Sequence, residues 1–375
     1  MIKCTDPRLI GTSDRSTSWE CVAADVSMAD IGCMRPETPH PADQGLHVPY
    51  LPARLRWRCP RVGVAALVLT LMVGVLGCRA IGLATPAGTL PNIPVVTAGG
   101  NQLWADLAWD DGWRVQRHVW TGHARLLDDG DVRRAWGGEE ACMECLVDRR
   151  VRGDALPIRR KTVVLLHGLW RTRDSMDVWK TTFEDAGYDA IDIAYPSARE
   201  GIEDHAAQVA GLLNRLSGEG REISFVTHSL GALVVRALFA REGDPWRERH
   251  TAHRAVFVAA PNGGAEIARV GLRIPGVRAI YGEPMGELAH GIADELPVPP
   301  IPFATVSAGR GDGEGWNPLI EGDDDGVVSV AETHLEGEAS ALFVEGFHSF
   351  VMRDLEVART ALDFIDVRSS VMITR

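Results

Sequence analysis

The chain has 375 residues, of which 45% are apolar and 24% are charged, and these values are typical of globular proteins. They exclude a fibrous protein, a polytopic membrane protein and a chain that is disordered throughout. The formal net charge of -12 leaves no basic surface for a phosphate backbone, so we expect no nucleic-acid partner. The acidic excess lies in residues 161–375, which hold 20 basic and 33 acidic side chains.

The first part of the chain carries signals for export. Residues 1–53 show neither helical nor strand periodicity, and we expect a disordered or untranslated leader. Residues 54–61 hold four arginines directly before an uncharged apolar run at 62–77, so residues 54–78 are predicted to be a signal peptide or a membrane anchor. The run ends in VLGC, which resembles the lipobox of bacterial lipoproteins and implies a lipidated Cys78.

An uncleaved signal-anchor helix and another kind of cleaved signal are the alternatives for this segment. All three would export the remainder of the chain, and a lipid or an anchor helix would hold it at the membrane. A buried helix of a cytoplasmic protein is the remaining alternative. We therefore expect a membrane-anchored protein whose folded part lies outside the cytoplasmic membrane.

Residues 79–99 and 100–159 separate the export segment from a larger folded part. The first stretch is rich in Pro, Gly and Ala and is expected to be a tether. The second is predicted to be a small α+β appendage with a β-hairpin over residues 113–127. It holds five of the eleven tryptophans: Trp104, Trp109, Trp113, Trp120 and Trp136. We expect these rings to be buried against the larger domain, with a carbohydrate or lipid platform as the alternative.

All seven cysteines fall before residue 161, so the rest of the chain has neither a cysteine nucleophile nor a thiolate metal site. Cys142 and Cys145 form a CxxC pattern, but no second CxxC or histidine pair stands at zinc-binding spacing. In an exported protein we expect a local disulfide here, or a pair that has lost its partner.

Residues 160–375 alternate short apolar runs with amphipathic stretches. Six runs are of the kind that buried parallel strands show: residues 161–166, 190–194, 223–226, 254–259, 303–307 and 341–344. The stretches after the first three runs carry apolar residues at helical spacing. This alternation predicts an α/β fold in which a doubly wound, mostly parallel sheet has helices on both faces.

Ligands bind to such a sheet beyond the carboxyl ends of its strands, so the residues that follow each strand matter most. The motif THSLG at 227–231 places Ser229 between a strand and an apolar helix. A tight turn at this place lifts the serine hydroxyl clear of the sheet, and the strained backbone requires small neighbours.

Further motifs follow other predicted strands: LLHGLW at 165–170, DGVV at 325–328 and GFH at 346–348. Together with the serine motif and in this order, they resemble the α/β-hydrolase superfamily, in its bacterial lipase and esterase branch, over about residues 160–368. Thr227 stands where many members have glycine. The resemblance implies the α/β-hydrolase fold for this domain.

The resemblance also implies a catalytic triad. Ser229 would be the nucleophile and His348, after a predicted strand near the C-terminus, the base that removes its proton. His228 and His167 are expected not to act as the base. Asp325, the aspartate of the DGVV motif, would orient the imidazole and stabilise its charged form.

The three adjacent carboxylates at 323–325 could instead indicate a calcium site, but a cation needs more oxygen ligands than this run supplies alone. A GxGxxG or P-loop fingerprint is absent from the sequence. We therefore expect neither a metal nor a cofactor.

Two backbone N–H groups are expected to stabilise the oxyanion of a tetrahedral intermediate. They belong to Leu230, directly after the nucleophile, and to Leu169 in the HG turn. Residues 265–302 lack a strand pattern and carry many apolar side chains, so a short lid is predicted there. An apolar stripe of this kind can also pack on the core.

The sequence thus predicts a serine hydrolase that cleaves carboxylic esters, with hydrophobic acyl groups favoured by the apolar lid. A thioesterase or an acyltransferase on the same triad is one alternative. A non-catalytic module that binds lipid or glycan of the cell envelope is another. The expected partners are an ester or lipid substrate and the membrane, and the sequence leaves the oligomeric state open.

Overall fold

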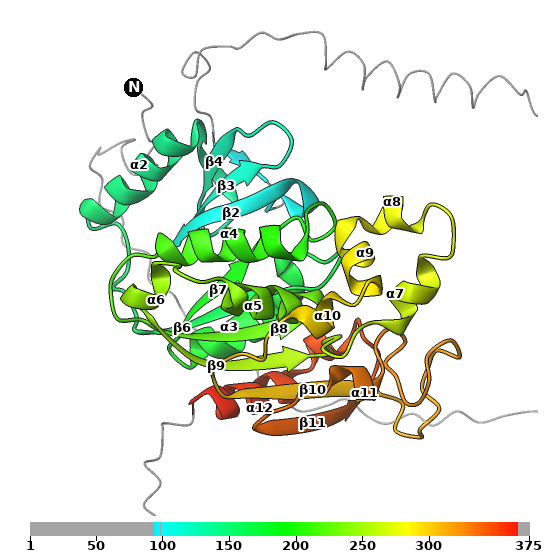
Figure 1. Ribbon diagram of the computed structural model, residues 1–375. Helices are drawn as coiled ribbons and strands as arrows, with labels where there is room; N and C mark the ends of the chain where they lie inside the picture. Colours follow the sequence, from blue (N-terminus) through cyan, green and yellow to red (C-terminus); the bar gives the residue numbers. More distant parts are fainter. Residues whose placement is uncertain (1–93, 98, 367–375) are drawn as a thin grey trace, which may run out of the picture. The chain divides into compact units, whose positions relative to one another are not determined.

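The computed structural model describes residues 94–97 and 99–366, which fall within one unit by their contacts (Figure 1). The predicted leader, the signal or anchor segment with Cys78, and most of the tether lie outside the described residues. Within the described ranges, none of the helices has the length and apolarity needed to span a membrane.

The appendage is an antiparallel sheet of five strands followed by a helix. The strands are β1 (Val95–Val96), β2 (Trp104–Asp110), β3 (Trp113–His118), β4 (Ala124–Leu127) and β5 (Val132–Gly137). Their order is β1-β5-β4-β3-β2, and α2 (Glu139–Val151) packs against β3, β4 and β5. We call this the N-terminal sheet. The hairpin expected over residues 113–127 is present as β3 and β4.

The two cysteines of α2 do not pair with each other. Cys145 is disulfide-bonded, whereas Cys142 is a buried free thiol. Burial raises the pKa of the Cys142 thiol to about 12. The expectation of a local disulfide between them is therefore wrong, although both side chains lie in the small apolar core beneath α2.

The second sheet has six strands, all parallel. They are β6 (Lys161–Leu166), β7 (Asp189–Ile193), β8 (Glu222–His228), β9 (Thr251–Val258), β10 (Phe303–Gly309) and β11 (Ser340–Glu345). The order β11-β10-β9-β8-β6-β7 is that of a doubly wound sheet. The predicted mostly parallel α/β sheet is confirmed.

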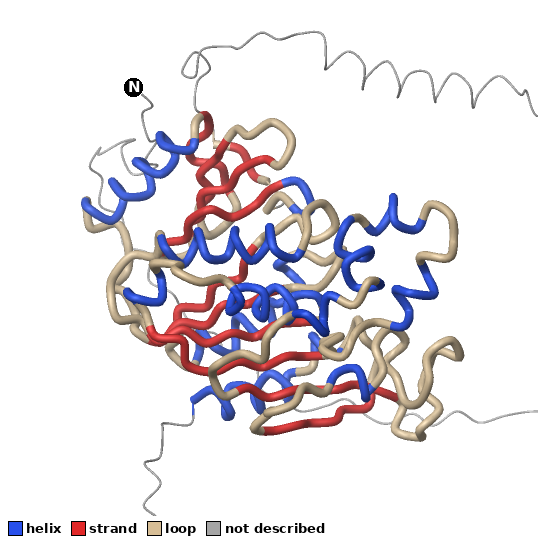
Figure 2. Tube along the Cα trace, in the orientation of Figure 1, coloured by secondary structure: helices blue, strands red, loops and turns tan. Residues whose placement is uncertain are grey.

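Helices cover both faces of this sheet (Figure 2). On one face lie α4 (Ile202–Asn214) and α5 (Leu230–Ala240), and on the other lie α3 (Asp177–Asp185) and α12 (Leu355–Asp366). Alternate residues of β6 enter the two cores, with Val164 and Leu166 in one and Val163 and Leu165 in the other. A strand buried on both sides therefore shows a continuous apolar run in the sequence.

Short helices complete the fold. They are η2 (Asn101–Leu103), η3 (Arg173–Met176), α6 (Trp246–Arg249), α11 (Val330–Thr333) and η4 (Val351–Arg353). The predicted lid is a helical insertion that holds α7 (Glu266–Gly271), α8 (Val277–Tyr281), α9 (Glu283–Ala289) and α10 (Ile292–Glu295). Leu288 and Ala293 of this insertion join the core, whereas Ile274 and Ile280 are exposed.

Candidate active site

Ser229 stands alone between β8, which ends at His228, and α5, which begins at Leu230. Its backbone has φ 52° and ψ -121°, a conformation that residues other than glycine rarely adopt. A Cβ on Gly231 would lie 2.7 Å from the carbonyl oxygen of Leu166, so only glycine permits this approach of α5 to β6. The predicted serine turn thus has a strained backbone and a small neighbour.

Ser229, His348 and Asp325 form one chain of hydrogen bonds. The Nε2 atom of His348 lies 3.0 Å from the Oγ atom of Ser229, and its Nδ1 atom lies 2.7 Å from the Oδ2 atom of Asp325. The other carboxylate oxygen of Asp325 accepts the N–H groups of Val327 and Val328 at 2.9 and 2.8 Å. Three side chains that are distant in sequence therefore meet, and the carboxylate among them is held by two N–H groups of its own loop.

This arrangement determines which nitrogen of His348 carries the proton. An ionised carboxylate can only accept hydrogen bonds, so Nδ1 of His348 must donate to Asp325. The Nε2 atom then has its lone pair directed toward the hydroxyl of Ser229. Asp325 is 1% exposed and His348 is 8% exposed, so water competes little for these contacts. The imidazole is in the tautomer that can accept a proton from the serine.

The neighbouring carboxylates have other partners. Asp323 accepts the N–H groups of Arg310 and Gly311 at 2.7 and 2.8 Å. Asp324 accepts the N–H groups of Asn317 and Gly326. Both side chains thus shape the loop that carries Asp325. Among residues 94–97 and 99–366, no group of three or more His, Cys, Asp or Glu side chains is arranged to hold a metal ion.

The HG turn packs directly against the serine turn. A Cβ on Gly168 would lie 3.1 Å from the Cβ atom of Ser229 and 2.8 Å from the Nδ1 atom of His228. The predicted oxyanion donors belong to Leu169 in this turn and to Leu230 after the serine. Neither of their N–H groups donates a backbone hydrogen bond to another described residue.

Two histidines near the site act as buried neutral donors. The Nε2–H of His228 donates to the carbonyl of His348 at 3.0 Å, and burial lowers the pKa of His228 well below its usual value. Nδ1 of His167 bonds the Gly168 carbonyl at 2.9 Å, and burial lowers the pKa of His167 to about 4. The hydroxyl of Tyr195 donates to the carbonyl of His167. These side chains hold the backbone of His348, the predicted base, and of the HG turn.

Sequence reasoning missed two further contacts of these loops. The guanidinium of Arg171 donates to the hydroxyl of Ser349, the residue after the predicted base. The side-chain amide of Gln102, in the N-terminal part, donates to the carbonyl of Arg171 at 2.8 Å. These partners lie up to 178 positions apart in sequence, and no local pattern indicates them.

Exposed aromatic rings flank the loop of His348. The rings of Trp316 and Phe347 lie 4.2 Å apart at 30°, and that of Phe350 lies 6.4 Å from Phe347. They are between 40% and 59% exposed. Phe347 directly precedes the predicted base, so these rings place apolar surface beside the triad.

The parallel sheet, the serine turn after β8 and the loops after β10 and β11 together make an α/β-hydrolase fold, as the sequence predicts. No family model matches the chain, and a search of curated proteins returns no match.

Among solved structures, the chain is similar to a Bacillus licheniformis lipase, BlEst2, in its propeptide form. The two share 16% identity over 59% of this chain and 53% of that chain, with a TM-score of 0.46. The chain thus spans about half the length of that lipase. A metagenomic carboxyl esterase shares 18% identity over 54% of this chain and 72% of its own, with a TM-score of 0.39. A phospholipase from Legionella pneumophila, PlaB, shares 16% identity over 46% of this chain and 45% of its own, with a TM-score of 0.35.

Proposed function

We propose that this protein is a serine hydrolase that cleaves carboxylic esters, with Ser229 as nucleophile, His348 as base and Asp325 as acid. The observation that carries the proposal is the 3.0 Å contact between Nε2 of His348 and Oγ of Ser229, with Asp325 on the opposite ring nitrogen. A partly exposed serine bonded to a buried histidine, which is in turn bonded to a buried aspartate, is the arrangement that nucleophilic catalysis requires.

The proposed reaction has two stages. The hydroxyl of Ser229 attacks the ester carbonyl while His348 accepts its proton, and the N–H groups of Leu169 and Leu230 bind the oxyanion that forms. His348 then passes the proton to the departing alcohol, which leaves an acyl group on Ser229. Water attacks this acyl-enzyme by the same steps, releasing the carboxylic acid and restoring the serine.

The proposal extends to hydrophobic acyl groups. The rings of Trp316, Phe347 and Phe350 offer apolar surface next to the proposed base, and a helical insertion follows β9. Apolar area buried on binding favours a longer acyl chain by about 0.8 kcal/mol per methylene. Hydrophobic esters should therefore be turned over with a higher kcat/KM than acetate esters.

The test is covalent labelling of the full-length protein with a fluorophosphonate. We expect wild type to be labelled, Ser229→Ala and His348→Ala to lose labelling, and Ser340→Ala, an exposed serine at the start of β11, to behave as wild type. A wild type that keeps its fold but takes no label would refute the proposal. p-Nitrophenyl esters of increasing chain length then measure acyl preference, and added alcohols reveal transfer in place of hydrolysis.

The proposed export and anchoring concern residues outside the described part of the chain. We propose that Cys78 carries a lipid after cleavage, on the basis of the VLGC motif that ends the apolar run. Cys78→Ser should then move the protein from the membrane fraction to the soluble fraction of its host. Unchanged membrane retention would instead favour an uncleaved anchor helix.

A further inference from the structure

The segment 167–173, which is the loop after β6 together with the first residue of η3, carries the proposed oxyanion donor Leu169. Within this loop, the N–H of Arg171 bonds the carbonyl of Gly168 at 3.1 Å. Trp170 has φ 58°, a left-handed conformation that is strained for any residue with a Cβ. A loop with a strained residue and few internal bonds keeps its shape only when its surroundings hold it.

The first external support comes from η2, at the start of the N-terminal sheet. The side-chain amide of Gln102 donates to the carbonyl of Arg171 at 2.8 Å and to the hydroxyl of Ser197 at 3.0 Å. Its carbonyl oxygen accepts the N–H of Ala198 at 3.0 Å. One amide therefore ties the loop after β6 to the loop after β7.

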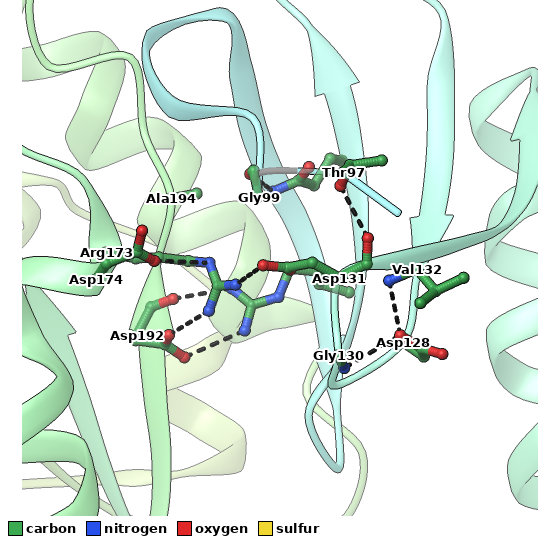
Figure 3. Close-up of polar contacts among 12 residues, drawn as sticks. Thr97, Gly99, Asp128, Gly130, Asp131, Val132, Arg173, Asp174, Asp192 and Ala194 are labelled. Carbon is green, nitrogen blue, oxygen red and sulfur yellow. Dashed lines mark hydrogen bonds and ion pairs between the residues drawn. The ribbon is translucent and has the colours of Figure 1, made fainter. Parts of the chain in front are cut away.

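The second support is a cluster of charged side chains at the other end of the loop (Figure 3). The guanidinium of Arg173 contacts Asp192 of β7 at 2.7 Å and also pairs with Asp131, in the turn between β4 and β5. Asp192 further contacts Arg114 of β3 at 3.2 Å and Lys180 at 3.3 Å. Asp192 is fully buried, so its charge must remain paired.

The same loop reaches the proposed base through Arg171, whose guanidinium donates to the hydroxyl of Ser349. On its outer side, the guanidinium of Arg199 lies 5.9 Å from the ring of Trp170 and 5.5 Å from that of Trp120. Trp120 belongs to the turn between β3 and β4. The N-terminal part of the chain thus contacts this loop directly through Gln102 and Asp131, and indirectly through Trp120 and the intervening Arg199.

We infer that the N-terminal sheet is a positioning element of the active site, in which Gln102 and Asp131 hold residues 168–173 so that the N–H of Leu169 faces the oxyanion. This inference rests on the proposed function. An oxyanion donor acts in the transition state, so loss of its position lowers kcat and leaves KM nearly unchanged. If the N-terminal sheet only added stability, variants that break its contacts would have a lower melting temperature, but kcat would not fall separately from KM.

The test compares three variants of the full-length protein with wild type. Gln102→Glu keeps the acceptor for Ala198 and removes the donor to Arg171. Asp131→Asn removes the charge that pairs with Arg173. The control is Glu139→Gln, which breaks an ion pair at 3.1 Å between α2 and Arg215, the residue directly after α4, away from the loop.

Two measurements are needed, of which one is independent of activity. Trypsin cuts after Arg171 and Arg173, so nicking at these two bonds, followed by mass spectrometry, reports how firmly the loop is held. We expect nicking to be about fivefold faster in the two test variants, the effect of losing one hydrogen bond, and unchanged in the control. With p-nitrophenyl esters we expect kcat to fall by roughly tenfold or more in the test variants, below the 10²–10³ loss of a whole donor, with KM within about threefold of wild type.

The inference is overturned if nicking in both test variants equals that of wild type. It is also overturned if nicking rises while kcat stays unchanged, or if Glu139→Gln lowers kcat equally. Should Asp131→Asn fail to fold, the near-isosteric Gln102→Glu decides alone. A wild type without any esterase activity refutes the proposed function, and the nicking rates then decide whether the sheet holds the loop.

Discussion

The replacement Asp325→Asn tests the proposed triad most sharply, because it exchanges one carboxylate oxygen for an NH2 group and keeps the shape of the side chain. One oxygen of Asp325 accepts two backbone N–H groups, and the other accepts Nδ1–H of His348. An asparagine has one acceptor oxygen and one NH2 donor in place of these two oxygens. The single amide oxygen can accept either the two backbone N–H groups or the Nδ1–H of His348, but not both.

The structure indicates which orientation the amide takes. With its oxygen toward Val327 and Val328, both backbone bonds are kept, and the NH2 group faces His348. The imidazole must then carry its proton on Nε2, where it points at Ser229 and cannot accept the serine proton. The opposite orientation leaves two N–H groups unpaired, that of Val328 in a buried and that of Val327 in a partly buried position, at about 1–3 kcal/mol each.

These numbers give the expected size of the effect. A penalty of about 2–6 kcal/mol leaves the productive orientation populated at roughly 10⁻² to 10⁻⁴. Loss of the carboxylate charge also removes stabilisation of the imidazolium. We therefore expect kcat to fall by about 10³–10⁴, in line with the roughly 10⁴ loss for the same change in a serine protease triad. The melting temperature should change little, because both backbone bonds survive.

Initial rates with a p-nitrophenyl ester, fluorophosphonate labelling rates and thermal melting measure these effects together. The control is Asp323→Asn, which alters a neighbouring carboxylate that accepts two backbone N–H groups but does not contact His348. We expect the control to keep kcat within about threefold of wild type. An Asp325→Asn protein that retains more than a tenth of the wild-type kcat would refute the assignment of Asp325 as the acid.

Three further predictions concern the scaffold. Burial lowers the pKa of His167 to about 4 and that of His205 to about 3, so below pH 6.5 the unfolded chain binds more protons than the folded one. The free energy of unfolding should therefore fall by about 1.4 kcal/mol per histidine for each pH unit from 6.5 toward 4, and equal melting temperatures at pH 7 and pH 5 would contradict this. Gly231→Ala should destabilise the fold by about 1–3 kcal/mol in urea unfolding, because its Cβ would meet the carbonyl of Leu166 at 2.7 Å; unchanged stability would show that the backbone yields. The thiol of Cys142, with a pKa raised by burial to about 12, should resist iodoacetamide at pH 8 in the native protein and react in urea, and rapid native alkylation would show that α2 opens.

The sheet and the serine turn could be predicted because their signals are local. A strand buried on both faces gives an apolar run, and a strained turn gives a serine between small residues, so residues 161–166 and 227–231 each carried their own evidence. Charge and spacing could not distinguish Asp325 from Asp323 and Asp324 as the predicted acid. Only the resemblance of its DGVV motif to that of the α/β-hydrolases selected it. The structure places only Asp325 of the three against His348.

The contacts around the loop at 167–173 could not be predicted, for a physical reason. Gln102 and Asp131 are ordinary polar residues of a small sheet, and their partners lie 69 and 42 positions further along the chain. Which of them meet depends on the packing of two separate sheets, which periodicity does not describe. The expectation of a disulfide between Cys142 and Cys145 was wrong for a similar reason, since the spacing of a CxxC pattern does not show whether its two cysteines pair with each other.

Most supports of the site hold main-chain atoms. Gln102 bonds the carbonyl of Arg171, His228 that of His348, and Tyr195 that of His167. Such contacts determine where a backbone N–H or a loop lies and do not depend on the side chain of the residue they hold. The proposed oxyanion donor is itself a backbone N–H, so changes at Leu169 that keep the loop shape should matter less than changes at residues far from it in sequence. The active site would then depend on both sheets, although the three proposed triad residues all follow strands of the parallel sheet.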